Sequence, residues 1–298
     1  MYSIAENEAG IPADGIFRSC LMQIAMIQDK IVPAKETEEI YFDRGIFFGD
    51  GVYEVIRSYN GRIFALEEHL QRFAGSLSGI KITGVDIELI RSRILRAFDA
   101  AGIADAKIYF HVTRGSQPRD RVWNSALKPN FLLTVSEVTD NTEEKTKGIA
   151  VSTHPDWRWK RCDIKSLNLL ANVLAANDAE SKGCVEAILV DEDGLITEGA
   201  GSAFFAIQGQ TLQTAPLTAN ILPSITREYA IKAGRNIGLE IVEKSLTVEQ
   251  AACSDELLIA STTQDTVGVV KFDDKVIGDG KPGKYTKLIT KEFLSFTV

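Results

Sequence analysis

Cysteine, histidine and long apolar runs are scarce in this chain of 298 residues, and each scarcity excludes a class of protein. The four cysteines stand far apart and form no C-x-x-C pair, which argues against a zinc or redox motif and favours free thiols in a reducing cytoplasm. With three histidines and no H-x-x-x-H spacing, no metal site is expected. No stretch approaches the roughly 20 apolar residues of a membrane span, so we expect no membrane association.

Basic residues are also in the minority. A net charge of -8 and a pI near 5.1 lack the electrostatic footprint of a nucleic-acid binder, so no nucleic-acid partner is expected. The N-terminal segment carries Glu6, Glu8 and Asp14 where a secretory signal has a basic region, and we expect no signal peptide. What remains is ordinary globular composition, with 45% apolar and 25% charged residues, enough for one large domain or two of moderate size.

Hydrophobic periodicity predicts mixed helices and strands. In the first half we expect helices over 66–78 and 86–100, the second ending at Gly102, and strands over 107–113 and 130–135, the second one buried. In the second half we expect helices over 167–182, 224–237, 247–252 and 283–296, and strands over 239–243 and 256–261. Turn residues predict two hairpins, 185–197 around Asp193-Gly194 and 203–214 near Gly209.

Residues 139–148, TDNTEEKTKG, contain no apolar residue and end in glycine. Such a stretch is typical of an exposed linker between domains. The sequence therefore predicts a small N-terminal α/β domain over 1–138, whose first 25 residues form an extension, and a larger C-terminal domain over 149–298.

Taken by themselves, the polar residues leave their roles open. Lys165 precedes an apolar stretch and follows other cations, so it is either a nucleophilic amine with a lowered pKa or an exposed lysine before a helix. The runs 224–226 and 261–263 are rich in hydroxyls and either hold an anion or cap and end their elements. Arg72 lies on the polar face of its predicted helix, as a solvated charge would. FGDG at 48–51 favours a tight turn before a strand.

Several strings together resemble the class IV aminotransferases, which use pyridoxal phosphate on the fold type IV scaffold, and they are closest to the D-amino acid transaminase branch. The resemblance begins near residue 30 and continues to the C-terminus. The matching strings are DRGIFFGDGVYEV at 43–55, EEHLQR at 67–72, VTRGSQPR at 112–119, RWKRCDIKSLNLLANVLA at 158–175, ITEG at 196–199, SITRE at 224–228 and ASTTQ at 260–264.

The resemblance implies roles in the chemistry for two residues. Lys165 corresponds to the lysine that forms the Schiff base with the cofactor and then moves the proton. Glu198 corresponds to the carboxylate that pairs with the pyridine nitrogen and keeps it protonated, so that the ring can act as an electron sink.

The resemblance also implies a phosphate site. Arg72 corresponds to the family's phosphate-binding arginine, whose planar guanidinium suits a bidentate contact. Ile225 and Thr226 match a phosphate site at a helix N-terminus, and Ser261 with Thr262 match hydroxyls at a strand end.

Substrate recognition departs from the family pattern. Tyr53 and Arg119 resemble two members of the trap that binds the substrate α-carboxylate in D-amino acid transaminases. The third member is normally a histidine, and Arg121 stands in its place. EGAGS at 198–202 replaces a serine-rich run and is closer to branched-chain aminotransferases.

These features predict a D-amino acid transaminase that moves an amino group from a substrate such as D-alanine to a 2-oxo acid such as 2-oxoglutarate in two half-reactions. The resemblance further implies a two-domain subunit with the cofactor between the domains, and a homodimer. The alternatives are an L-branched-chain aminotransferase, another sibling such as an (R)-amine transaminase or an aminodeoxychorismate lyase, and a non-catalytic binding protein of the same fold.

Overall fold

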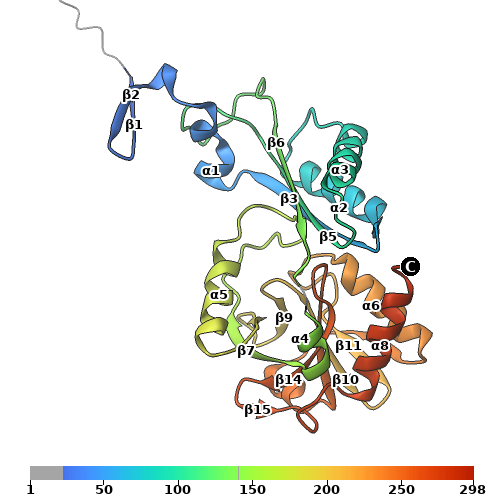
Figure 1. Cartoon of the computed structure of the whole chain (residues 1–298). Helices are drawn as coiled ribbons and strands as arrows, with labels where there is room; N and C mark the ends of the chain where they lie inside the picture. The colour runs from blue at the N-terminus through green and yellow to red at the C-terminus, as the bar shows by residue number, and fades with distance from the viewer. Residues whose placement is uncertain (1–22, 140) are drawn as a thin grey trace, which may run out of the picture. The chain divides into compact units, whose positions relative to one another are not determined.

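The computed structural model describes residues 23–139 and 141–298 (Figure 1). Residues 23–42 contain a small antiparallel hairpin of β1 (Ile24–Ile27) and β2 (Lys30–Pro33), followed by 3-10 turns at Ala34–Glu36 and Glu39–Phe42. The hairpin turns at Gln28, which has a positive φ of 51°. Of the extension predicted over 1–25, residues 1–22 lie outside the described part of the chain.

Within residues 42–298, the first sheet of the described chain has four antiparallel strands in the order β4-β3-β5-β6. Helices α2 and α3 pack on one face around a core that includes Phe73, Ile94, Ile108 and Phe110. Asp86 caps the first turn of α3. Gly102 ends the helix in a left-handed conformation, as the sequence predicts. The elements are α1 (Arg44–Phe48), β3 (Gly51–Tyr59), β4 (Arg62–Ile63), α2 (Leu66–Gly79), α3 (Ile87–Ala101), β5 (Ala106–Thr113) and β6 (Asn130–Glu137).

The second sheet is mixed and has nine strands among the described residues, ordered β12-β11-β10-β13-β14-β7-β8-β9 with β15 beside β14. Its strands are β7 (Ile149–Pro155), β8 (Glu186–Val190), β9 (Ile196–Gly199), β10 (Ala203–Gln208), β11 (Thr211–Thr214), β12 (Glu240–Glu243), β13 (Glu256–Ser261), β14 (Asp265–Phe272) and β15 (Lys275–Val276). The helices are α4 (Thr142–Lys147), α5 (Leu170–Ser181), α6 (Ile225–Asn236), α7 (Val248–Ala252) and α8 (Lys284–Ser295).

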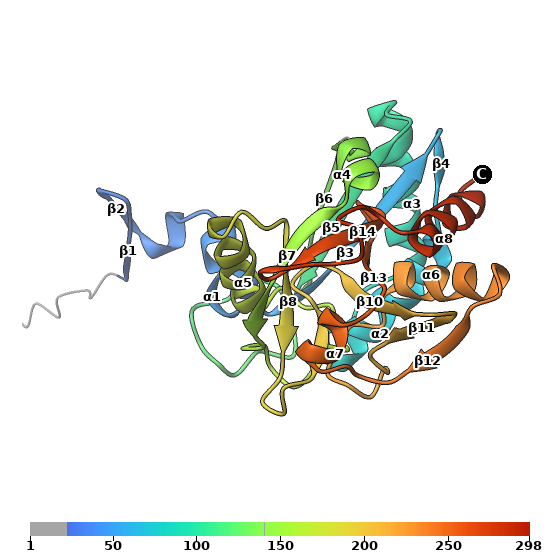
Figure 2. The ribbon, with the colours of Figure 1, turned by 90° about the horizontal axis from the view of Figure 1, so that it is seen from below.

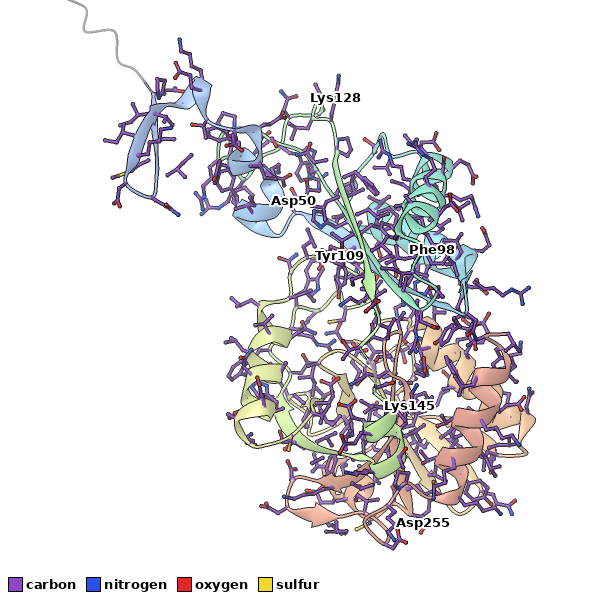
Figure 3. All side chains as sticks on the ribbon, viewed as in Figure 1. Asp50, Phe98, Tyr109, Lys128, Lys145 and Asp255 are labelled. Atoms are coloured by element: carbon purple, nitrogen blue, oxygen red, sulfur yellow. The ribbon has the colours of Figure 1, made fainter. Side chains whose placement is uncertain are left out.

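Side chains fill both faces of this second sheet (Figure 3). On β10, Phe204 belongs to one buried cluster and Phe205 to another on the opposite face, because successive side chains alternate along a strand. Helices α6 and α8 lie side by side over the second cluster (Figure 2). A strand covered on both faces reads as a continuous apolar run, which explains the sequence AFFAI at 203–207.

The structure confirms the predicted helices and both hairpins to within a few residues, and it corrects two details. The strand over 130–135 is half-exposed rather than buried, because β6 is the edge strand of its sheet. The stretch 139–148, which its polar composition predicted to be an exposed linker, contains the helix α4. A domain boundary at this stretch stays a prediction. Over the described ranges, no helix has the length and apolar character that crossing a membrane demands.

Candidate active site

Lys165 lies in the irregular segment between β7 and α5, where its backbone is held against the start of β3. Its amide donates to the Ser76 hydroxyl at 3.1 Å, and its carbonyl accepts from the Tyr53 amide at 3.0 Å. Val52 and Ser166 form an antiparallel bridge beside it. The lysine is therefore fixed by strand-like contacts and does not sit on a free loop.

The FGDG string makes this approach possible. Gly49 ends α1 in a left-handed conformation with φ 62°, and β3 begins two residues later. A Cβ on Gly51 would lie 2.7 Å from both the Leu167 side chain and the Val112 carbonyl, closer than real Cβ contacts. The string forms a tight turn before a strand, as predicted, and its second glycine lets the lysine segment pack closely.

The amine of Lys165 points at the ring and hydroxyl of Tyr53. Its Nζ donates to the Tyr53 hydroxyl at 3.3 Å and lies 4.4 Å from the ring centroid. An aromatic face stabilises a nearby ammonium. The ring of Tyr53 is in turn 5.9 Å from that of Tyr109, whose hydroxyl is 2.9 Å from His111 Nδ1. The reading of Lys165 as a plain surface lysine is therefore wrong.

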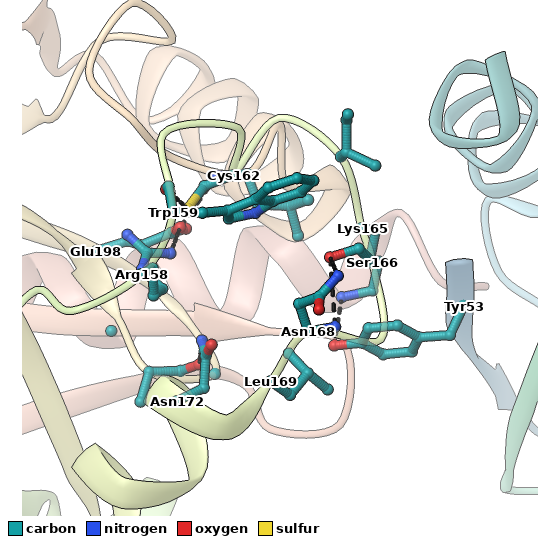
Figure 4. A pocket seen from close by; sticks show the side chains of 15 residues that line it. Tyr53, Arg158, Trp159, Cys162, Lys165, Ser166, Asn168, Leu169, Asn172 and Glu198 are labelled. Carbon is teal, nitrogen blue, oxygen red and sulfur yellow. Dashed lines mark hydrogen bonds and ion pairs between the residues drawn. The ribbon is translucent and has the colours of Figure 1, made fainter. Parts of the chain in front are cut away.

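Lys165, Tyr53 and Glu198 line one cavity of about 100 Å³ (Figure 4). The turn 199–201 forms part of its wall, and Asn172 holds that turn by donating to the Ala200 carbonyl at 2.7 Å. The cavity thus places an amine and a carboxylate on one small space, although they are far apart in the sequence.

Glu198, on β9, is buried and forms an ion pair with Arg158. It also accepts from the Leu222 amide at 3.0 Å. Arg158 donates to Asp156 as well, with Nε at 2.9 Å and Nη2 at 2.7 Å. Burial raises the pKa of Glu198, and the Arg158 charge, the two hydrogen bonds and the Lys165 charge offset only part of that rise. Glu198 thus shares its cationic partner, Arg158, with Asp156.

Arg72 projects from α2 into a buried cluster, and its reading as a solvated charge is wrong because its side chain is 9% exposed. Its Nε and Nη2 each donate to Glu54 at 2.7 Å, and His69 Nδ1 is 2.7 Å from the same carboxylate. Its Nη1 donates to the Pro223 carbonyl at 3.1 Å. This last contact links Arg72 to the residue just before the cap of α6.

The start of α6 has the local structure of an anion site. Ser224 caps the helix by accepting from the Arg227 amide, as its sequence predicts. Ile225 and Thr226, both buried, are the first two helical residues, so their amides have no intrahelical acceptor. The helix dipole favours negative charge at this end.

Ser261 and Thr262 lie at the end of β13, which packs against α6. The Ser261 hydroxyl donates to the Gln264 side chain at 3.3 Å. Arg72 is thus hydrogen-bonded to the residue before the cap of α6, and α6 packs against β13. Lys165, Tyr53 and Glu198 line one cavity.

Arg119 and Arg121 are not brought to that cavity. Both are exposed, and the guanidinium of Arg119 lies 5.3 Å from the ring centroid of Phe48. Arg121 lines a different cavity, which shares only Trp159 and Asn168 with the first. A carboxylate trap of Tyr53 with both arginines is therefore not assembled within one chain.

The donor set fits pyridoxal phosphate. The amine of Lys165 and the buried carboxylate of Glu198, whose pKa is raised, line one cavity. The Arg72 guanidinium is hydrogen-bonded to Pro223, the residue before the N-cap of α6. Sequence reasoning missed Arg158, Glu54 and His69. Arg158 lies within the string RWKRCDIK, but its partner is 40 positions away, so no spacing could indicate the pair.

The fold and the site place a lysine amine and a buried carboxylate on one cavity. The chain belongs to the class IV aminotransferases, because the family model for amino-transferase class IV matches residues 51–272. This confirms the family, the aminotransferase activity and the cofactor that the sequence predicted.

Individual proteins similar to this chain are also aminotransferases. The chain is 39% identical to a D-alanine aminotransferase of Bacillus licheniformis, over 82% of this chain and 87% of that protein. It is 34% identical to a D-alanine aminotransferase of Staphylococcus haemolyticus, over 91% and 97%. Its fold resembles a branched-chain amino acid aminotransferase of Escherichia coli with a TM-score of 0.82 and 23% identity, over 90% and 92%. The last match supports the predicted fold type.

Proposed function

We propose that this chain is a D-amino acid transaminase that exchanges an amino group between a D-amino acid such as D-alanine and a 2-oxo acid such as 2-oxoglutarate. The observation that carries the proposal is one cavity lined by Lys165, Tyr53 and Glu198, with Lys165 Nζ hydrogen-bonded to the Tyr53 hydroxyl. The D-alanine aminotransferases among its relatives, at 39% and 34% identity, support the choice of enantiomer over the branched-chain alternative.

Each residue then has a defined task. When bound, pyridoxal phosphate supplies an electron-withdrawing ring that stabilises the carbanion left by loss of the substrate α-proton. The amine of Lys165 holds the cofactor and moves that proton. The carboxylate of Glu198 pairs with the protonated ring nitrogen. Arg72, the amides of Ile225 and Thr226, and the hydroxyls of Ser261 and Thr262 bind the phosphate.

A half-reaction tests the enantiomer. D-Alanine is added without oxo acid to the purified holoenzyme, L-leucine is added in a parallel cuvette, and the absorbance of the bound cofactor is followed. We expect the band to change with D-alanine alone, and 2-oxoglutarate to restore it. Lys165→Ala should abolish the change, whereas Lys160→Ala, an exposed lysine outside the cavity lining, should not. A change with L-leucine alone would transfer the enzyme to the branched-chain branch.

We also propose a homodimer. Helix α5 packs Ala175 and Ala179 against the sheet, yet Leu170 is 73% and Val173 50% exposed on the same helix. A helix that is apolar on both sides usually has a second partner. A second copy of this chain would cover that face. Leu170→Glu should then lower the molar mass in light scattering, whereas Glu180→Lys, an exposed change on the same helix, should not. An unchanged mass for both variants would count against this face.

The exposed positions of Arg119 and Arg121 lead us to propose that they bind the substrate carboxylate in the cavity of the second copy. Lys165→Ala and Arg119→Ala should each be inactive as pure proteins. After unfolding and refolding together, hybrid dimers would contain one cavity with both residues intact, and activity should return. If the arginines act within their own chain, the mixture stays inactive.

A cytoplasmic location is part of the proposal. Among the described residues, Cys162, Cys184 and Cys253 are free thiols, as a reducing compartment favours. Fractionation of cells that express the protein, with marker enzymes for each compartment, tests this placement.

A further inference from the structure

Asp265, at the start of β14, is a completely buried acid that is used by none of the roles above. Arg57 Nη1 donates to its Oδ1 at 2.9 Å, and the Tyr59 hydroxyl donates to the same oxygen. Lys145 Nζ donates to Oδ2 at 2.5 Å. Arg57 and Tyr59 come from β3, and Lys145 comes from α4, where Figure 3 labels it. We call these four residues the Asp265 cluster.

The backbone of Asp265 is itself unusual, with φ 59°. A residue other than glycine in the left-handed region is uncommon, and the surrounding contacts must hold it there. The cluster therefore specifies the path of the chain as it leaves the loop 262–264 and enters β14.

Arg57 and Asn141 also hold the backbone of the loop 262–264. Arg57 Nη1 donates a second time, to the Thr263 carbonyl at 3.0 Å. Asn141, just before α4, donates from its side-chain amide to the Gln264 carbonyl at 3.1 Å. Gln264 in turn accepts from the Ser261 hydroxyl. Contacts from β3 and from the start of α4 thus reach the backbone between Ser261 and Asp265.

Charge adds to this restraint. One carboxylate faces two cations, Arg57 and Lys145, and the guanidinium of Arg57 lies 4.5 Å from the ring centroid of Tyr59. The cluster carries one net positive charge directly beside a loop that we assign to a phosphate dianion. Because the groups are largely buried, this charge is only weakly screened by salt.

We propose that the Asp265 cluster is a positioning device for cofactor phosphate: it fixes the loop 261–264 so that the hydroxyls of Ser261 and Thr262 are preorganised for the dianion. The inference rests on the proposed phosphate site. None of the four cluster residues needs to contact the cofactor. A plain structural staple between β3, α4 and β14 is the competing explanation, and it predicts no dependence on the phosphate group.

The experiment compares two probes on the cofactor-free protein, pyridoxal phosphate and pyridoxal, which lacks the phosphate. Binding is followed by the absorbance change in Lys145→Met and Asp265→Asn. We expect the dissociation constant of pyridoxal phosphate to rise by about ten-fold, with that of pyridoxal changing by less than about two-fold. Lys145→Arg keeps the charge and should retain most of the affinity for pyridoxal phosphate.

Lys147→Met is the matched control, because Lys147 lies on the same helix but is 72% exposed and pairs with exposed Glu143. It should leave both constants unchanged. Lys145 is 21% exposed, so Lys145→Met still gives an answer if Asp265→Asn does not fold. Equal weakening of both probes, or no weakening, would overturn the positioning role. If the wild-type protein binds both probes equally, the phosphate site itself is wrong, which is a separate failure.

Discussion

Two buried glutamate–arginine pairs occur among the described residues, and the pKa values of their carboxylates are shifted in opposite directions. Glu54 shares both oxygens with Arg72 and also contacts His69. Although burial raises its pKa, these partners outweigh burial and lower it to about 2. Glu198 shares Arg158 with Asp156, and burial keeps its pKa raised.

The difference separates a fully paired carboxylate from a partly paired one. Arg72 donates to both oxygens of Glu54, which suits a residue that orients this arginine. Glu198 shares Arg158 with Asp156, and we expect this carboxylate to stabilise an additional cation such as a protonated ring nitrogen. The two buried glutamates thus differ in pKa because Glu54 pairs with Arg72 through both oxygens, whereas Glu198 shares Arg158 with Asp156.

The largest expected effect is on turnover, and it concerns Glu198. Glu198→Gln should lower kcat by about 10²- to 10³-fold, because the ring nitrogen loses its anionic partner. The free energy of unfolding should change little, because Arg158 keeps Asp156. Steady-state kinetics beside urea unfolding measures both. Wild-type turnover in this variant would remove the distinction between the two pairs.

The next effect is on stability, and it concerns Glu54. Glu54→Gln leaves Arg72 buried without its anion and should lower the free energy of unfolding by about 3 kcal/mol. Cofactor affinity should fall with it, because Arg72 loses its orientation. Glu67→Gln is a control on α2, since Glu67 is exposed and pairs with Arg91 at the surface, and it should leave the unfolding curve unchanged. A stable Glu54→Gln protein would mean that Arg72 does not depend on Glu54.

The smallest effect is on the pH dependence of stability, and it concerns Glu54. Its folded pKa of about 2 lies below the ordinary value of 4.5, so its contribution is present above pH 4.5 and is lost as the pH falls toward 2. At about 1.4 kcal/mol per pKa unit this amounts to about 3 kcal/mol, of which unfolding titrations down to about pH 3 sample only a part. The difference in the free energy of unfolding between wild type and Glu54→Gln should become smaller as the pH falls over that range. A constant difference would show that the pKa of Glu54 is the same in the folded and the unfolded protein.

Local structure was largely predictable from the sequence. The stripe of apolar residues in α2 and the capping residues of α3 and α6 act within a few positions of one another, and so does the Asp193-Gly194 turn. Helix α4 was missed because a polar stretch of six residues gains its stability from outside, here through Lys145 and Asp265. The exposure of β6 was missed because an edge position depends on the order of strands.

The candidate site likewise contains residues that the sequence predicted and residues that only the tertiary structure brought to it. The strings around Lys165, Glu198 and Arg72 already contain the amine, the carboxylate and the guanidinium that the chemistry requires. Their partners could not be read from the sequence: Arg158 reaches Glu198 across 40 positions and Arg57 reaches Asp265 across 208. Nor could the sequence show that Arg119 and Arg121 lie outside the cavity of Lys165.

The sequence by itself determined which side chains are available and where helices, hairpins and caps begin, because these depend on neighbours along the chain. The tertiary structure alone decided which charges are buried together and which are shared, because desolvation and Coulomb interactions depend on distance in space. Distance in space gives Glu54 two donors of Arg72 and makes Glu198 share Arg158 with Asp156.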